Sequence, residues 1–206
     1  MHNLDPSKIV CVGRNYAAHA KELGNEVPRE PLIFLKPPSS IIREGESIRL
    51  PAVSEQVEYE GEIGVIIGKR LRKASRDEAR EAIAGIVAAN DVTARDLQKS
   101  DGQWTRAKGF DTFCAVGGVA PVPTDLGSLT VTTRVNGTVR QQGNAHDMVF
   151  DLPSILEYIA GIMTLEAGDL VLTGTPEGVG TLAAGDVVEV EIPGVSRVSN
   201  PVTRDE

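Results

Sequence analysis

The stretch Val57–Lys69, VEYEGEIGVIIGK, decides the fold class of this 206-residue chain. Its first half alternates apolar and polar residues, which is the period of a β-strand with one face in water. Carboxylates two positions apart on a strand lie about 7 Å from each other, and three in a row without an interleaved cation repel one another. The apolar face carries Val57, Tyr59, Ile63, Val65 and Ile67, and the acidic face carries Glu58, Glu60 and Glu62.

These residues alone leave two interpretations of the acidic face open. It is either a solvated edge that carries charge to prevent edge-to-edge pairing, or a site where a divalent cation lies between the carboxylates and cancels their repulsion. Gly61 and Gly64 flank Glu62. Glycine inside a strand often marks the close approach of a ligand or of another backbone, which fits the second interpretation.

Length and composition limit the class of protein. With 206 residues and 41% hydrophobic content the chain can bury one full core, so a single domain is expected. The net charge of −8 and the lack of a long basic run argue against binding to nucleic acid or to an anionic membrane. The sequence shows neither a long apolar span nor a signal-peptide pattern, so we expect no transmembrane helix and a cytoplasmic protein.

The two cysteines, Cys11 and Cys114, both lie among apolar residues. We interpret them as buried free thiols in a reducing cytosol rather than as a disulfide. The sequence contains no pair of cysteines separated by two residues. A metal site in this chain would therefore use oxygen ligands.

A compact helix is predicted near the N-terminus, in RNYAAHAKELGN (14–25), after a short buried strand at 8–12. Asn15 can cap the start of this helix and Gly24 can end it. His19 and Glu22 are three residues apart and so face the same way. They form either an exposed pair worth a few tenths of a kcal/mol or a functional pair.

The remaining pattern is rich in short strands. Asn136-Gly137 predicts a type I′ hairpin turn within 130–141. Ser75 and Glu78 form a capping box, and Asp151 with Pro153 starts another helix. The polar stretch 99–110 is expected to be a loop. Further strands are predicted at 32–36, 47–50, 85–89 and 169–173, and a pair of strands is predicted in 187–202. Asn90 and Asp91 follow the strand at 85–89.

The glycine-rich segment GTPEGVG (174–180) does not match a nucleotide-binding loop. It lacks the Gly-Lys-Ser/Thr ending of a P-loop, and it does not fit GxGxxG. Its backbone N–H groups around Gly174 and Thr175 can instead receive an oxyanion.

Taken together, five motifs resemble the fumarylacetoacetate hydrolase family, and most closely its short acylpyruvase and oxaloacetate decarboxylase branch. They occur in the family's order and cover nearly the whole chain. The resemblance implies an α+β, mainly β fold, a mixed β-roll with a short N-terminal lid helix, usually found as a homodimer. It implies one domain over 1–206, with the N-terminal strands and lid in 1–50 and the roll in 51–206. The motifs are GRNYAAHAKE (13–22), Glu60-Gly61-Glu62, NDVTARDLQ (90–98), WTRAKGFD (104–111) and LTGTPEGVG (172–180).

The resemblance also implies a role for particular residues. Glu58 lies outside the family's ligand set and is expected in a second shell or in solvent. The implied metal ligands are Glu60, Glu62 and Asp91; the implied catalytic residues are His19, Glu22 and Lys108; and the implied substrate contacts are Arg95, Gln98, Gly174 and Thr175.

Three hard carboxylates with open positions suit Mg²⁺ or Mn²⁺, with Ca²⁺ as a substitute in a crystal. The first hypothesis is a metal-dependent hydrolase that cleaves C–C bonds in acylpyruvate-like β-diketo acids. His19, oriented by Glu22, takes a proton from water, and the metal and Lys108 stabilise the pyruvate enolate. The second is an oxaloacetate-type decarboxylase, or an isomerase/decarboxylase of 2-oxo diacids from aromatic degradation. The third is a non-catalytic, metal-stabilised dimer that binds 2-oxo acids.

Overall fold

The structure is a computed structural model that describes residues 5–205. Within this range the chain forms a seven-stranded, a five-stranded and a three-stranded sheet. Most neighbouring strands are antiparallel, but three pairs of neighbouring strands are parallel. The seven-stranded sheet has the order β2 (Leu32–Lys36), β1 (Ile9–Gly13), β12 (Leu170–Leu172), β6 (Gly61–Ile67), β7 (Ile83–Asp91), β9 (Cys114–Val116) and β3 (Ile41–Ile42).

The two other sheets are smaller. The hairpin between β10 and β11 turns at Asn136 and Gly137, whose φ angles of +51° and +78° confirm the expected type I′ turn. The five-stranded sheet has the order β11 (Thr138–Asn144), β10 (Thr130–Val135), β14 (Val187–Ile192), β15 (Ser196–Arg204) and β4 (Ile48–Leu50), and the three-stranded sheet the order β13 (Gly180–Thr181), β5 (Val57–Tyr59) and β8 (Thr93–Ala94).

Short helices connect these strands. The predicted caps of α2 and α5 are confirmed: Ser75 and Glu78 form the capping box of α2, and Asp151 caps α5. The helices are α1 (Ala17–Glu22), α2 (Arg76–Glu81), α3 (Arg95–Asp101), α4 (Thr105–Lys108) and α5 (Leu152–Ile162), with 3-10 turns η1 (Pro38–Ser40) and η2 (Ala145–Asp147).

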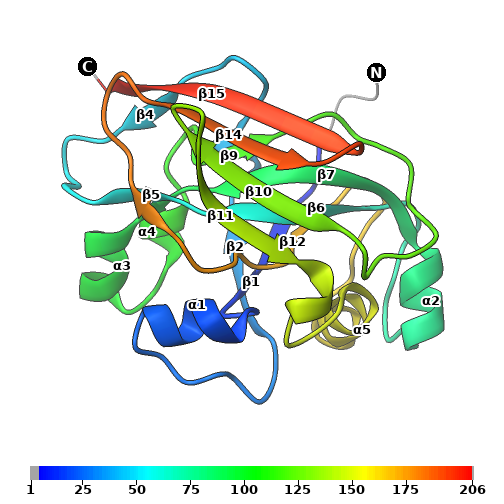
Figure 1. Cartoon of the computed structure of the whole chain (residues 1–206). Helices are drawn as coiled ribbons and strands as arrows, with labels where there is room; N and C mark the ends of the chain where they lie inside the picture. The colour runs from blue at the N-terminus through cyan, green and yellow to red at the C-terminus, as the bar shows by residue number, and fades with distance from the viewer. Residues whose placement is uncertain (1–4, 206) are drawn as a thin grey trace.

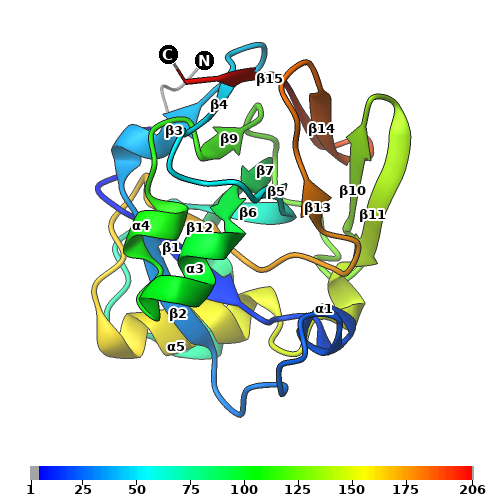
Figure 2. The same cartoon turned by 90° about the vertical axis from the view of Figure 1, so that its left-hand side faces the viewer.

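The largest hydrophobic cluster lies where the five-stranded sheet packs on β6 and β7. In Figure 1 strands β14 and β15 lie above β6 and β7 and β10 crosses in front of them, whereas α1 and α5 lie below. Figure 2 shows α3 and α4 side by side on the face toward the viewer, with α1 lower and to the right of them. The expected mainly β fold of the α+β class is confirmed.

The stretch Val57–Lys69 is not one strand with a wet face. It divides at Glu60 into β5 and β6, which belong to different sheets, and every residue from 57 to 67 is buried. The predicted apolar face is confirmed, because its five members all join the largest hydrophobic cluster. The acidic face is buried as well, so the interpretation as a solvated edge is wrong.

The two glycines of this stretch allow close packing of side chains. A Cβ on Gly61 would lie only 1.9 Å from the Thr133 hydroxyl of β10, and one on Gly64 would lie 2.6 Å from a Val87 methyl group of β7. Real Cβ contacts are never that short. These glycines therefore make room for side chains of neighbouring strands, not for a ligand.

Two local expectations are wrong. Asn15 does not cap α1: Tyr16 holds the cap position without a side-chain bond, while the Asn15 amide donates to the carbonyl oxygens of Phe150 and Thr173 at 3.0 and 2.8 Å. The stretch 99–110 is not a loop, because it contains the end of α3 and all of α4.

The cysteines are buried and free, as predicted. Burial raises the pKa of Cys114 to about 12, and burial together with Asp91 raises that of Cys11. Both thiols are therefore protonated and unreactive at neutral pH. Among the described residues no helix is both long and apolar enough to cross a membrane.

Candidate active site

The carboxylates of Glu60, Glu62 and Asp91 meet at one place in the interior. Glu60 lies between β5 and β6, Glu62 lies on β6, and Asp91 ends β7. The pairing of β6 with β7 brings them together, and the Asp91 N–H donates to the Glu60 carbonyl at 2.8 Å. One oxygen from each carboxylate lies within 4.8 Å of the others. The three predicted ligands, Glu60, Glu62 and Asp91, therefore form one buried cluster, which we call the triad.

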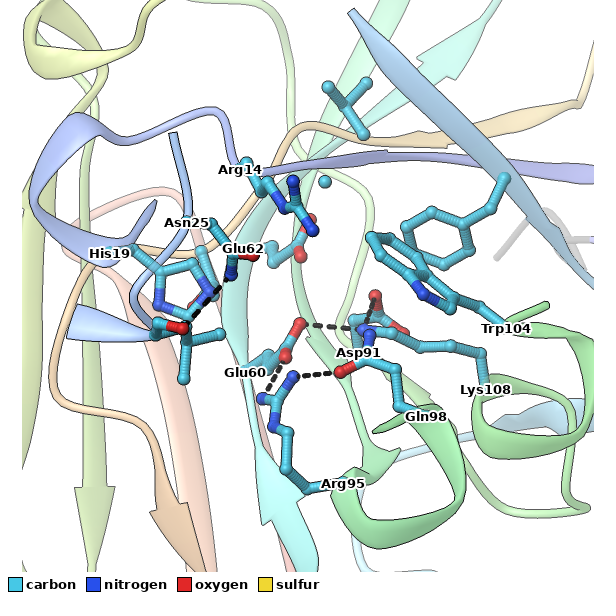
Figure 3. Close-up of a pocket in the computed structure, with 15 residues that line it drawn as sticks. Arg14, His19, Asn25, Glu60, Glu62, Asp91, Arg95, Gln98, Trp104 and Lys108 are labelled. Carbon is cyan, nitrogen blue, oxygen red and sulfur yellow. Dashed lines mark hydrogen bonds and ion pairs between the residues drawn. The ribbon is translucent and has the colours of Figure 1, made fainter. Parts of the chain in front are cut away.

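Cationic side chains from α3, α4 and β2 surround this cluster; Figure 3 shows the two from α3 and α4, Arg95 and Lys108. Lys108, at the end of α4, donates to Glu60 Oε2 at 2.8 Å and to Asp91 Oδ2 at 2.7 Å. Arg95, which begins α3, pairs with the other oxygen of Glu60 and with Glu58 Oε2 at 2.8 Å. Glu58 is thus a buried partner of Arg95, outside the triad.

Lys36 is a third buried cation and was not predicted. It ends β2, and its ammonium group donates to Asp91 Oδ1 at 2.7 Å and to the Val92 carbonyl at 3.2 Å. A buried lysine requires such a partner. The signal in the sequence was a lysine at the end of the apolar run LIFLK, but nothing local indicated which acid it meets.

The charges separate the triad into paired and unpaired members. Burial opposes ionisation of Glu60, but Lys108 and Arg95 outweigh it and hold the pKa of Glu60 well below its usual range. Burial, Asp91 and Glu60 all raise the pKa of Glu62. Within residues 5–205 Glu62 has no cationic partner; its Oε2 accepts only the Gly174 N–H at 2.7 Å.

This donor set fits a hard divalent cation. Three carboxylates converge on one point that is shielded from water, and Glu62 forms no ion pair there with any residue of the described range. Oxygen ligands of this kind are those that Mg²⁺ and Mn²⁺ prefer. A bound cation would remove the electrostatic cost of burying Glu62 in its charged form.

The predicted pair His19 and Glu22 lies together on α1. His19 Nδ1 lies 3.2 Å from Glu22 Oε2, and the other oxygen of Glu22 accepts the Gly178 N–H at 3.0 Å. His19 is only 4% exposed and lines the same cavity as the triad. The interpretation as an exposed pair is therefore wrong for His19, although Glu22 itself is exposed: Glu22 orients a buried imidazole whose Nε2 is left for the cavity.

The four predicted substrate contacts differ in their surroundings. Arg95 and Gln98 bond to each other at 2.6 Å and line the cavity, as does Thr175. The Thr175 hydroxyl donates to the Gly61 carbonyl at 2.9 Å and accepts from Gln141 at 2.8 Å. Gly174 does not line the cavity, and its N–H is used by Glu62. The idea that this N–H receives an oxyanion is therefore wrong.

The cavity is small and has walls of two kinds. Its volume is about 40 Å³, room for roughly two or three water molecules. One wall is aromatic: Trp104 meets Phe34 edge to face at 5.1 Å, and the Lys108 ammonium lies 5.0 Å from the Phe34 ring centre. Lining residues that the sequence did not single out are Val12, Gly13, Arg14, Leu23, Asn25, Phe34 and Trp104.

Residues 8–203 match the family model described as fumarylacetoacetate (FAA) hydrolase C-terminal, so the chain belongs to the fumarylacetoacetate hydrolase family. The buried triad and the paired histidine are thus the candidate active site of an enzyme of this family. The membership confirms the resemblance seen in the sequence.

Three relatives illustrate the range of the family. The mitochondrial oxaloacetate decarboxylase of Dictyostelium discoideum is 45% identical over 195 residues, which cover 91% of this chain and 89% of that protein. The mitochondrial oxaloacetate tautomerase of Arabidopsis thaliana is 46% identical over 204 residues, covering 96% and 92%. The crystal structure of fumarylpyruvate hydrolase from Pseudomonas aeruginosa in complex with Mn²⁺ and pyruvate superposes with a TM-score of 0.90 at 30% identity, covering 97% and 91%.

Proposed function

We propose that this chain is a Mg²⁺- or Mn²⁺-dependent hydrolase that cleaves the C–C bond of acylpyruvate-like β-diketo acids. The observation that carries the proposal is a shared cavity: a histidine oriented by a carboxylate, a buried lysine and a three-carboxylate cluster all lie around it. The Pseudomonas relative, which holds Mn²⁺ and pyruvate, supports both the cation and the 2-oxo acid class.

Glu60, Glu62 and Asp91 would hold the cation, which when bound neutralises their charge and accepts the carboxylate and 2-oxo oxygens of a substrate. Arg95 keeps Glu60 in place, and Lys36 does the same for Asp91. Lys108, whose ammonium group lies beside Glu60 and Asp91, presents a positive charge to the substrate oxygens. Positive charge fixed in a dry site stabilises an anion that forms during reaction.

His19 acts as the general base in this proposal. With Nδ1 held by Glu22, its Nε2 removes a proton from water while the water oxygen bonds to the distal ketone carbon. The C–C bond then breaks, and its electron pair remains on C3 of the pyruvate fragment as an enolate. Return of a proton to C3 gives pyruvate, and the acyl fragment leaves as a carboxylic acid.

A second candidate is an enzyme that acts on oxaloacetate or on a related 2-oxo diacid. The two oxaloacetate enzymes at 45 and 46% identity favour it, since the hydrolase relative is 30% identical. Decarboxylation, tautomerisation and isomerisation all pass through an enolate, so the same Lys108 and cation site serve them. A purely binding protein would need no oriented base, and membership of an enzyme family also speaks against it.

A turnover panel tests the proposal. Purified protein is incubated with Mg²⁺ or Mn²⁺ and, separately, with acylpyruvates, oxaloacetate and unsaturated 2-oxo diacids. Hydrolysis of an acylpyruvate, with loss of the activity in chelator, is the expected result. Turnover of oxaloacetate alone would replace the first candidate by the second, and no turnover of any compound would contradict both.

We also propose that the chain acts as a homodimer, as the family resemblance implies. The native mass from light scattering tests this: a mass of about twice that of the chain is expected, and a monomer would contradict it.

A further inference from the structure

The side chain of Gln141 makes three hydrogen bonds in the interior of the molecule. It lies on β11 and is 1% exposed. Its Oε1 accepts the Gly61 N–H at 3.0 Å, and its Nε2 donates to the Thr175 hydroxyl at 2.8 Å and to the Pro176 carbonyl at 2.8 Å. Because an N–H can only donate and a carbonyl oxygen can only accept, these partners fix the orientation of the side-chain amide.

Gly61, Gln141 and Thr175 form a closed ring of hydrogen bonds. The Thr175 hydroxyl has a single proton, and because its oxygen accepts from Gln141, that proton goes to the Gly61 carbonyl, 2.9 Å away. Hydrogen bonds within a buried network reinforce one another. The ring therefore holds the two peptide groups on either side of the Gly61 Cα, and these groups join Glu60 to Glu62.

A β-bulge directs Gln141 toward this ring. Arg134 of β10 opposes Val139 of β11, and Thr133 opposes Gln141, so Arg140 is an extra residue in β11. Since side chains alternate along a strand, a regular pairing would turn Arg140 inward and Gln141 outward. In the structure Arg140 is exposed and Gln141 is buried. Bulges re-aim side chains in this way and are frequent next to active sites.

We propose that Gln141 is a positioning residue of the candidate active site. Its side chain does not line the cavity, so it acts through its neighbours: the peptide groups of Gly61 set the spacing of Glu60 and Glu62, and Thr175 lies at the cavity wall. This inference rests on the proposed function, in which the triad holds the cation. Outer hydrogen-bond partners orient the ligands of a metal site, and losing one costs about 10- to 100-fold in affinity.

Mn²⁺ titration followed by electron paramagnetic resonance tests this at the cation site itself. Gln141→Met keeps the length of the side chain and removes its hydrogen-bonding atoms. It should weaken Mn²⁺ binding by about tenfold or more. It should also change the spectrum of the bound ion, because the line shape depends on the geometry of the ligands. A loss of packing alone would lower stability and leave that spectrum unchanged.

Thr175 provides the second arm of the experiment. Thr175→Val removes the hydroxyl with little change of shape and should also weaken Mn²⁺ binding, whereas Thr175→Ser keeps the hydroxyl and should behave as wild type. Because Gln141→Met and Thr175→Val open the same ring, the double variant should lose much less affinity than the product of the two single losses.

Two further variants are matched controls. Gln142→Met makes the same change at the next residue of β11, which is exposed. Asn200→Ala removes another buried amide, on β15, which donates to the carbonyls of Arg43 and Glu46 and lies outside the cavity lining. Both should keep the Mn²⁺ affinity and spectrum of the wild type, although Asn200→Ala should lower the free energy of unfolding in urea.

Results of three kinds would overturn the proposal. If Gln141→Met is less stable in urea but binds Mn²⁺ as the wild type does, Gln141 only supports the fold. If the losses of Gln141→Met and Thr175→Val simply multiply, the two residues do not act through one ring. If Gln141→Met does not fold, Thr175→Val still opens the ring, and wild-type affinity and spectrum in that variant would contradict the proposal. A wild type that binds no Mn²⁺ would instead contradict the proposed function, and the role of Gln141 with it.

Discussion

The ammonium group of Lys36 lies 2.7 Å from Asp91 Oδ1, and both residues are 1% exposed. These residues come from β2 and β7, which are separated in the seven-stranded sheet by β1, β12 and β6. The pair therefore joins distant parts of the sheet through the candidate metal ligand. Because each charge is buried, removing one leaves the other without full compensation.

Lys36→Met should lower the free energy of unfolding of the cation-free protein by about 3 kcal/mol, measured by urea denaturation. In the double variant Lys36→Met/Asp91→Asn the loss should be smaller than the sum of the single losses by about 1–3 kcal/mol, because neither charge is then stranded. Lys69→Met is the control, since Lys69 and its partner Glu81 are 50 and 71% exposed; it should cost less than about 0.5 kcal/mol. Strict additivity of the two single losses would contradict the coupling.

The sequence predicted the acids of this site and two of the cations around them, Arg95 and Lys108, but not the third, Lys36. Glu60, Glu62 and Asp91 could be found because strand alternation and the family motifs mark them. Lys36 could not, because its strand pairs with β1 and only the curl of the whole sheet brings it to Asp91. For the same reason the acidic face looked solvated: the cations that pair with Glu58 and Glu60 lie 35 to 48 residues away along the chain.

Local signals explain what else was found and missed. The hairpin, α2 and α5 carry turn or cap residues that act on their own backbone, and each was predicted. Helices α3 and α4 have Ala94 and Trp104 at their N-cap positions, which form no side-chain cap bond, and they are only seven and four residues long. In the sequence, such helices therefore cannot be distinguished from a polar loop by their length or by a capping residue. Asn15 had the right residue type for a cap, but tertiary bonds to Phe150 and Thr173 took its amide.

The triad should determine metal affinity. Glu60→Ala, Glu62→Ala and Asp91→Ala are each expected to weaken Mn²⁺ binding by about 100-fold or more, since loss of even an outer partner costs 10- to 100-fold. Mn²⁺ titration followed by electron paramagnetic resonance measures this without an activity assay. Glu58→Ala is the control, because it removes a buried carboxylate of the same stretch that pairs with Arg95. Wild-type Mn²⁺ affinity in Glu62→Ala, or full turnover by that variant in chelator, would exclude the metal site.

The segment around α1 should open and close. A six-residue helix without a side-chain cap is marginal on its own. Mg²⁺ with oxalate should slow amide hydrogen exchange over residues 15–24 by about tenfold or more, as a closing lid does. Helix α2 has the same length but a capping box, and it does not line the cavity; its exchange should change little. Unchanged exchange over 15–24 would argue against a lid.

Asp169 should contribute stability that depends on pH. Its buried carboxylate accepts from the Ser7 hydroxyl at 2.7 Å, the Glu166 N–H at 2.8 Å and the Lys8 ammonium. Burial opposes ionisation, but these donors outweigh it and lower the pKa of Asp169. Because the folded pKa lies below the unfolded value of about 3.9, the contribution is full at neutral pH and is lost as the pH falls from about 4 through the folded pKa.

Asp169→Asn should therefore be less stable than wild type by about 1–3 kcal/mol at pH 7, and the difference should shrink below about pH 4. Urea denaturation at a series of pH values measures both quantities. A difference that stays constant down to pH 2 would mean that the charge of Asp169 is not what stabilises the fold.

His19 separates the two leading reactions. Hydrolysis requires water to lose a proton as it attacks a ketone, and losing a general base typically costs 10²- to 10⁴-fold, or about 3–5 kcal/mol of barrier. Decarboxylation needs no attacking water, so there His19 serves only to protonate the enolate or to close the lid. His19→Ala should therefore cripple acylpyruvate cleavage and reduce oxaloacetate decarboxylation much less. Glu22→Gln should follow the same pattern more weakly, because it removes the acceptor that orients the imidazole at 3.2 Å.

Both activities are measured on the same purified variant at saturating Mg²⁺. Mn²⁺ affinity is the control: because His19 is not a member of the triad, its loss should leave that affinity nearly unchanged. Equal losses in the two reactions would mean that the pair acts through lid closure or a proton step common to both. Acylpyruvate cleavage that survives in His19→Ala would place the base elsewhere, because another group would then be activating the water. A large loss confined to cleavage, with decarboxylation and metal binding retained, is the result that identifies His19 Nε2 as the group that activates water.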